Sequence, residues 1–311
     1  MGERAMIELV EVTDKLLFPE GPIAMADGSV LVVEIARQTL TRVQPDGSLE
    51  IVAQLGGGPN GAAMGPDGKV YVVNNGGAFT FPERWQEEGK LGLPERYEGG
   101  YIQRVDPTTG AVERLYDDCD GLPLNAPNDI VFDAHGGFWF TCFGYTDGET
   151  RRLGGIYYAK ADGSSITRWR HEQISPNGIG LSPDGKTLYW ADSILQRLWA
   201  VNLTAPGVPE EGAGHMAGRV VVNLPGMQWF DSLALDADGK ICAATLFDGG
   251  IKVIDPADGS YVHVPVPDPI TTNICFGGSD MQTAWITGSA SGKLFRGRWP
   301  VPGLRLEYQL I

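Results

Sequence analysis

The sequence predicts an all-β protein, a six-bladed β-propeller with four antiparallel strands in each blade. Three observations support this fold: a motif that recurs six times, a hairpin turn inside the motif, and 43 Gly and 21 Pro among 311 residues. So much Gly and Pro indicates many turns between short strands rather than long helices. A propeller of this size is a single unit, so we expect one domain over residues 1–311.

Each copy of the motif begins with a polar residue and continues with an apolar run, a turn with Gly and a second apolar run. The copies begin at Glu20, Asn60, Asn128, Asn177, Asp231 and Asn273. Successive starts are 40, 68, 49, 54 and 42 residues apart. Asp-Gly in the turn favours a hairpin because Gly accepts a positive φ. Another pair of short strands follows each hairpin, and a period of about 50 residues is typical of four-stranded blades.

Two segments outside the repeats have predicted roles. We expect the strand near Ile7–Val12 to pair with the last blade and close the ring, with Leu304–Tyr308 as a rival for that place. The insertion at residues 76–100 carries Phe79, Phe81, Trp85 and Tyr97. Long insertions in a regular repeat are either functional lids or decorative loops, and the aromatic side chains favour a partial lid over a site.

Composition excludes several classes of function. The formal net charge is −15, from 24 basic and 39 acidic residues, which would repel nucleic acids and anionic membrane surfaces. The sequence shows neither a signal peptide nor an apolar run long enough to span a bilayer, so we expect a cytoplasmic protein. The four cysteines lack metal-binding spacing, and no G-x-S-x-G motif indicates a serine hydrolase. The oligomeric state is left open.

The six residues that open the repeats are the candidate functional residues. They precede the innermost strand of each blade, so they should surround the mouth of the central channel. All six can offer an oxygen and two are carboxylates, whereas none is a thiol or an imidazole, which suits a hard cation such as calcium or magnesium. Turn chemistry alone would explain Asn60 or Asn177, but it would not explain Glu20. The pattern therefore favours a metal site in the channel.

Five short motifs, in order and at blade spacing, resemble the gluconolactonase and senescence-marker-protein (regucalcin) superfamily of six-bladed propellers. The resemblance runs from about Pro19 to Thr287. Its motifs are PEGP at Pro19–Pro22, LNAPND at Leu124–Asp129, SPNGIGLSPDGKTLYWADS at Ser175–Ser193, FDSLALDADGKICAAT at Phe230–Thr245 and TNICFGG at Thr272–Gly278.

The resemblance implies a metal-dependent hydrolase that opens a lactone ring. It implies that Glu20, Asn128, Asn177 and Asp231 hold one divalent cation, with calcium expected first and magnesium, manganese or zinc as alternatives. The cation would polarise the lactone carbonyl, and an activated water would attack it. We expect Asp231 to be the general base, with direct nucleophilic attack by Asp231 as the main rival.

Further residues have predicted supporting roles. Asn60, Asn125 and Trp229 are expected to contact the substrate, and Asp129 to orient the ligand Asn128 from behind. Asn273, like Asn60, is expected outside the set of ligands.

The chain departs from the sugar-lactone branches at one place. Those branches usually have an Arg shortly before the position of Asn128, where this chain has Leu122-Pro123-Leu124. Losing a guanidinium removes a multidentate partner for sugar hydroxyls, which favours a less polar lactone or ester. Two alternatives stay open: a phosphotriesterase or arylesterase with the same site, and a calcium-binding or interaction propeller without catalysis.

Overall fold

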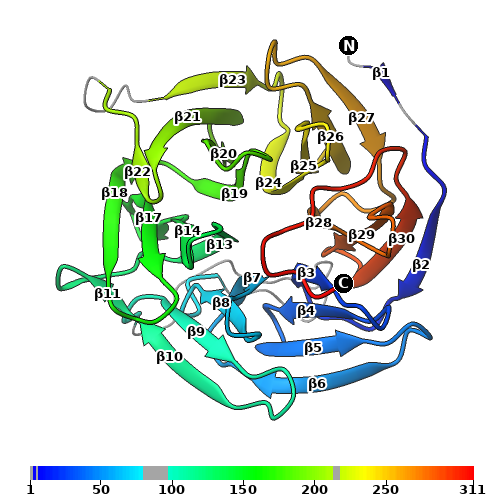
Figure 1. Cartoon of the computed structure of the whole chain (residues 1–311), viewed down its shortest axis with the longest axis horizontal. Coiled ribbons are helices and arrows are strands. Elements are labelled where there is room, and N and C mark those ends of the chain that lie inside the picture. The colour runs from blue at the N-terminus through cyan, green and yellow to red at the C-terminus, as the bar shows by residue number, and fades with distance from the viewer. Residues whose placement is uncertain (1–2, 5, 80–96, 213–217) are drawn as a thin grey trace.

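The six-bladed propeller is confirmed. The computed structural model describes residues 3–4, 6–79, 97–212 and 218–311, and within these ranges the chain forms strands, turns and loops without a helix. Figure 1 shows the blades arranged around a central channel, with the first strand of each blade innermost. The innermost strands pack side by side in the order β3, β7, β13, β19, β24 and β28, and β28 packs against β3 to complete the circle.

Each blade is an antiparallel sheet whose strands follow one another outward. Blade 1 contains β3 (Pro19–Ala24), β4 (Val30–Glu34), β5 (Thr39–Val43) and β6 (Leu49–Gln54). Blade 2 contains β7 (Pro59–Met64), β8 (Val70–Asn74), β9 (Tyr101–Val105) and β10 (Val112–Tyr116). Blade 3 contains β13 (Pro127–Phe132), β14 (Gly137–Cys142), β17 (Gly154–Lys160) and β18 (Ile166–Gln173).

The second half of the ring repeats the plan with small additions. Blade 4 contains β19 (Pro176–Leu181), β20 (Thr187–Asp192), β21 (Arg197–Ala205) and β23 (Arg219–Asn223), and β22 (Val208–Pro209) pairs with the end of β21. Blade 5 contains β24 (Trp229–Leu235), β25 (Ile241–Leu246), β26 (Gly250–Ile254) and β27 (Tyr261–Pro265). Blade 6 contains β28 (Thr271–Gly277), β29 (Thr283–Gly288), β30 (Lys293–Arg298) and β2 (Leu9–Thr13). Short hairpins join β11 (Asp118–Cys119) to β12 (Leu122–Pro123) and β15 (Tyr145–Asp147) to β16 (Thr150–Arg152).

An N-terminal strand closes the ring, as the sequence predicts. Strand β2 pairs antiparallel with β30, with Leu9 opposite Gly297 and Thr13 opposite Leu294. The last blade is therefore built from both ends of the chain, which ties the circle together by hydrogen bonds. A two-residue strand, β1 (Glu3–Arg4), lies parallel to β27 on the outside of blade 5.

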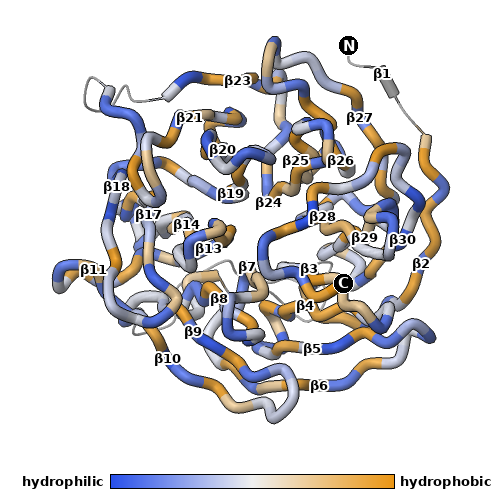
Figure 2. The backbone as a smooth tube through the Cα atoms, viewed as in Figure 1, coloured by the Kyte–Doolittle hydropathy of each residue, from blue (hydrophilic) through white to orange (hydrophobic). Residues whose placement is uncertain are grey.

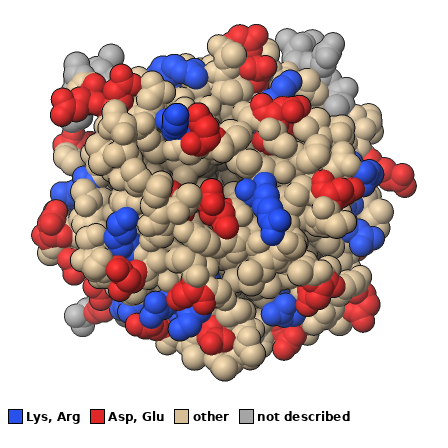
Figure 3. Space-filling model, in the orientation of Figure 1, with Lys and Arg blue, Asp and Glu red and all other residues tan. Residues whose placement is uncertain are grey.

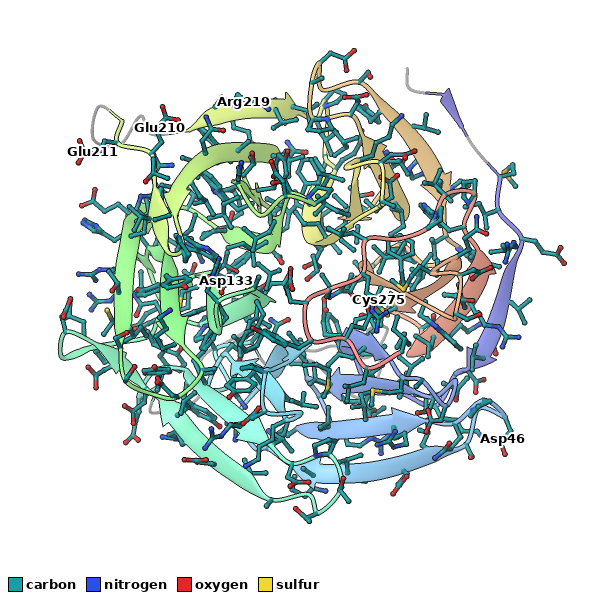
Figure 4. All side chains as sticks on the ribbon, in the orientation of Figure 1. Asp46, Asp133, Glu210, Glu211, Arg219 and Cys275 are labelled. Atoms are coloured by element: carbon teal, nitrogen blue, oxygen red, sulfur yellow. The ribbon has the colours of Figure 1, made fainter. Side chains whose placement is uncertain are left out.

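The segment Leu304–Tyr308 does not compete for that place, because it crosses one end of the channel instead (Figure 1). The Leu304 amide donates to the Leu235 carbonyl at 2.8 Å, and the Gln309 side-chain amide donates to the Phe276 carbonyl at 2.6 Å. Behind this segment lies a cavity of about 90 Å³ that is lined mainly by apolar residues of all six inner strands. One of its lining residues, Cys275, is labelled beside the channel in Figure 4.

Apolar side chains fill the space between neighbouring blades. The largest buried side chains include Trp139, Trp190 and Phe230, and Trp190 stacks on Trp199 with ring centroids 5.8 Å apart. The outer strands are half exposed, and β6 and β10 contain both hydrophobic and hydrophilic residues in Figure 2. Charged side chains of both signs are scattered over the face seen in Figure 3. No helix in the described part of the chain is long and apolar enough to cross a membrane.

Every inner strand carries one extra residue relative to its neighbour in the blade. The register shifts between Glu20 and Ile23, between Phe230 and Leu233, and at the corresponding place in the other four blades. Such β-bulges redirect side chains and are common next to functional sites. The six repeat-opening residues thus lie inside the first strands, at or beside the bulges, and not before the strands as the repeat pattern suggests.

Candidate functional site

The six repeat-opening residues meet at the end of the channel opposite the C-terminal segment. All are buried, with exposed fractions between 2% and 8%: Glu20, Asn60, Asn128, Asn177, Asp231 and Asn273. The inner strands can approach closely where glycine follows a ring residue, as it does at Gly21, Gly61 and Gly178. A Cβ on Gly178, for example, would lie 2.6 Å from the Asp231 carbonyl oxygen of the next blade. We call these six residues the oxygen ring.

The carboxylates of the oxygen ring resist ionisation in the absence of a cation. Burial raises the pKa of Glu20 to about 8, although hydrogen bonds from Asn273 and the Gly21 amide partly offset the effect. Burial and then the charge of Glu20 raise the pKa of Asp231 well above its usual range. Among the described residues, no ion pair joins either carboxylate to a Lys, Arg or His. Two buried carboxylates without a counter-charge are a favourable place for a divalent cation.

Two amide oxygens of the ring lack partners. Asn128 Oδ1 and Asn177 Oδ1 are buried from solvent and accept no hydrogen bond from any residue that the structure describes. A buried polar atom without a partner costs about 1–3 kcal/mol, so such atoms in a native site usually indicate a ligand, an ion or a water. Amide and carboxylate oxygens are the donors that calcium prefers. The residues present therefore fit a hard cation.

The described residues contain no cluster of three or more His, Cys, Asp or Glu side chains suited to a metal. A cation in the oxygen ring would therefore depend on the Asn oxygens as well as on the two carboxylates. The absence of thiol and imidazole donors from the ring agrees with a hard cation rather than with a thiolate-bound metal.

Hydrogen bonds fix the orientation of the candidate ligands. Asn273 Nδ2 donates to Glu20 Oε2 at 2.9 Å, and the Gly21 amide donates to the same oxygen at 2.8 Å. Asn177 Nδ2 donates to Ser193 Oγ at 3.0 Å. Both of the first two bonds fall on Oε2 of Glu20, so neither of them uses its Oε1. The Asn177 bond in turn holds the amide group so that Oδ1 is its free end.

Asp129 ties the two Asn-bearing strands together behind the ring. Its carboxylate accepts the amide of Ile130 at 2.8 Å and that of Ile179, in the next blade, at 3.2 Å. Burial raises the pKa of Asp129 to about 7. Thr141 adds a parallel link, since its hydroxyl donates to the Asn177 carbonyl at 2.6 Å and accepts the Asp129 amide at 3.2 Å. These bonds support the predicted role of Asp129 as an orienting residue.

The predicted substrate residues lie at different depths. Asn60 belongs to the oxygen ring, whereas Asn125 is half-buried above it, where its Nδ2 donates to the Leu153 carbonyl at 3.0 Å. Trp229 is half-buried beside the ring and packs edge-to-face on Phe247, with centroids 5.4 Å apart. Their contacts with a substrate stay predictions.

The predicted lid at residues 76–100 lies largely outside the described residues, including Phe81 and Trp85. Its two ends are described. Phe79 packs edge-to-face on Phe143 at 5.4 Å. Tyr97 donates to the Asn75 carbonyl at 2.9 Å and accepts the Ala126 amide at 3.0 Å. The returning end of the insertion is thus fixed two residues from Asn128, and closure over the site stays a prediction.

Two supporting residues were not predicted from the sequence. Thr141 acts across a blade boundary, so no local pattern marks it in the apolar run of β14. Ser193 ends the motif SPNGIGLSPDGKTLYWADS, yet its contact with Asn177 depends on how the hairpin of blade 4 brings its two ends together. Both residues required the tertiary structure.

The raised pKa values predict how pH affects the metal-free protein. Glu20, Asp129 and Asp231 keep protons in the folded state that they release when unfolded, so the free energy of unfolding falls as pH rises from about 4 to about 8. A cation that displaces those protons should stabilise the protein more at pH 8 than at pH 5. Thermal unfolding at both pH values, with chelator or with calcium, measures this. A calcium-induced rise in Tm that is equal at both pH values would contradict the site.

The fold and the site together define a class of protein: a six-bladed β-propeller with a buried ring of oxygen-bearing side chains at one end of its channel. The chain belongs to the SMP-30/gluconolactonase/LRE-like family, whose sequence model matches residues 18–290. This membership confirms the resemblance described above.

Individual relatives resemble the chain over most of its length. A gluconolactonase from Zymomonas mobilis is 24% identical over 311 aligned residues, covering 89% of this chain and 78% of that protein. The lactonase drp35 of Staphylococcus epidermidis is 24% identical, covering 79% of this chain and 69% of that protein. Among solved structures, regucalcin from Agrobacterium tumefaciens, a calcium-binding protein, superposes with a TM-score of 0.76 at 21% identity, covering 98% of this chain and all of that one. At this identity the structural match shows the shared fold.

Proposed function

We propose that the protein is a metal-dependent lactonase whose oxygen ring holds one divalent cation, with calcium as the first candidate. The observation that carries the proposal is the set of unpartnered Asn128 and Asn177 oxygens beside two desolvated carboxylates. Glu20, Asn128, Asn177 and Asp231 would be the ligands. Family membership and the lactonases among the relatives support lactone hydrolysis.

The reaction would divide between the cation and the chain. When bound, the cation would act as a Lewis acid toward the lactone carbonyl. Asp231 accepts a proton from water as the water oxygen bonds to the carbonyl carbon. The ring C–O bond then breaks, and the proton on Asp231 passes to the leaving ring oxygen to give the hydroxy acid. Hydrogen bonds from Asn273 and the Gly21 amide would hold Glu20 in one orientation throughout.

The same two carboxylates also argue against a binding propeller without catalysis. Burial and the charge of Glu20 raise the pKa of Asp231, and a carboxylate perturbed in this way by burial and a neighbouring charge is common in catalytic sites. A surface calcium platform would need no buried base beside the ion. Turnover is therefore the property to test first.

The test is hydrolysis of sugar and alkyl lactones by chelator-stripped protein, to which calcium, magnesium, manganese or zinc is returned singly. We expect the rate of lactone hydrolysis with the preferred ion to exceed the rate of the chelator-stripped protein by at least about 100-fold. Phosphotriesters and aryl esters serve as competing substrates in the same assay. If a folded protein that binds one ion hydrolyses none of the lactones, the lactonase proposal is wrong.

A further inference from the structure

Large apolar side chains are exposed around one side of the oxygen ring. Ile194 and Leu195, in the turn between β20 and β21, are 39% and 36% exposed. Met227, just before β24, is 63% exposed, and Phe247, in the turn between β25 and β26, is 43% exposed. We call these four residues, with the half-buried Trp229, the apolar rim.

Contacts across blades 4 and 5 make the apolar rim one surface. The Gln196 side-chain oxygen accepts the Gln228 amide at 2.6 Å, and the Gln196 carbonyl accepts the Leu224 amide at 2.9 Å. These bonds fasten the turn that carries Ile194 and Leu195 to the loop that carries Met227. The edge-to-face contact between Trp229 and Phe247 then joins that loop to the turn of blade 5.

The apolar rim is continuous with two candidate ligands. Trp229 precedes Asp231 by two residues on β24, a distance of about 7 Å along a strand. Ser193, which accepts the hydrogen bond of Asn177, comes directly before Ile194. A molecule whose carbonyl lies in the oxygen ring can therefore extend over the apolar rim.

The equivalent turns of blades 1 and 6 do not expose large apolar side chains. Between the second and third strands, blade 6 has Ser289-Ala290-Ser291-Gly292, and blade 1 has Ile35-Ala36-Arg37-Gln38 with its Ile35 buried. In the blade 6 turn, the Ser291 amide donates a hydrogen bond to Asp268 at 2.9 Å. Within the described residues, exposed large apolar side chains in the turns between second and third strands are thus confined to blades 4 and 5, whereas Leu122, 51% exposed, lies in the β11–β12 hairpin before β13.

Phe247 occupies a backbone conformation that favours glycine. Its φ is +72°, a left-handed value that is unfavourable for a bulky residue. A glycine or asparagine would adopt this conformation with less strain and would expose no aromatic ring. A strained and exposed Phe that packs on Trp229, two residues before Asp231, indicates a role for its side chain.

Resting on the proposed function, we infer that the apolar rim binds the non-reacting part of the substrate, so that the preferred substrates are lactones with an alkyl or aryl substituent. Burying each methylene of such a substituent is expected to raise kcat/KM about threefold to fourfold. The site would thereby select apolar lactones over polyhydroxylated ones, since the hydroxyl groups of a sugar would lose water against the rim.

The test compares δ-valerolactone, its 5-pentyl derivative and gluconolactone, each with the ion-loaded protein. We expect kcat/KM for the pentyl lactone to exceed that for δ-valerolactone at least tenfold, and gluconolactone to be the poorest of the three. The variant Phe247→Asn combined with Leu195→Ser should lower this ratio at least fivefold. Val220→Ser, at a 43% exposed residue on the outer strand β23, is the matched control and should leave the ratio unchanged.

Stability separates the binding role from a structural one. Since Asn tolerates a positive φ, Phe247→Asn should not lower the Tm even though it lowers the ratio. A ratio that is the same in wild type and variant overturns the inference. The inference is also overturned if the substrate ratio is unchanged while self-association in sedimentation, or binding to vesicles, depends on Phe247. The first result would assign the apolar rim to a second copy of the chain, and the second would assign it to a membrane. If none of the three lactones is hydrolysed, the proposed function fails instead.

Discussion

Replacing Asp231 by Asn is expected to lower kcat/KM for lactone hydrolysis by about 10³-fold while leaving the fold intact. Loss of a general base typically costs about 10²–10⁴-fold. The amide keeps an oxygen for the cation but cannot accept the proton from water. Because Asp231 is desolvated and repelled by Glu20, removing its charge should not destabilise the metal-free protein. Turnover at saturating ion, together with thermal unfolding, measures both effects.

Asp236→Asn is the matched control for that variant. Asp236 is also a buried aspartate of blade 5, with an exposed fraction of 2%, but it lies at the opposite end of β24 and accepts the Lys240 amide at 2.8 Å. An Asn there can accept the same hydrogen bond, so turnover should stay within about twofold of wild type. If Asp231→Asn with its ion bound retains more than a tenth of wild-type activity, Asp231 is not the base.

Replacing Glu20 by Gln is expected to weaken calcium binding about 100-fold or more. The number of charged ligands tunes calcium affinity over several decades, and Glu20 is one of only two carboxylates in the oxygen ring. The introduced amide would also lack the charge that favours the bonds now donated by Asn273 and the Gly21 amide. Isothermal titration with calcium measures the loss, and activity should recover only in part at high calcium.

Asn60→Ala provides the comparison within the same ring. Asn60 is as buried as the candidate ligands, at 6% exposed, but the ligand assignment leaves it out. Its replacement should change calcium affinity by less than about threefold. If Asn60→Ala and Glu20→Gln weaken calcium binding equally, the cation is held by a different subset of the ring.

Much of the fold could be predicted because the propeller repeats itself in the sequence. The Asp-Gly turns and paired apolar runs are local signals, and each of the six copies reports the same blade. The closing strand was predictable as well, since an unpaired blade edge requires a partner. The position of Leu304–Tyr308 was not, because its contacts are with inner strands of blades far from it in the chain.

Part of the candidate site, too, could be predicted from the sequence, whereas the rest required the structure. Its six members are visible in the sequence because each opens a repeat, and ring closure necessarily brings equivalent positions together. The sequence does not show which oxygens of the ring lack a hydrogen-bond partner. That depends on the hydrogen bond that Asn273 donates to Glu20 and on the one that Ser193 accepts from Asn177. It depends also on Thr141, whose hydrogen bond to the Asn177 carbonyl joins blades 3 and 4.

The sequence by itself therefore determined the blade number, the oxygen ring and the family, because a repeat places equivalent residues at equivalent positions. Only the tertiary structure decided the division of the ring into supported carboxylates and unpartnered amide oxygens, and the gathering of the apolar rim on blades 4 and 5. The physical reason is that hydrogen bonds and exposed surfaces between blades join residues that are distant in the chain, and burial then sets their pKa values and their need for a ligand.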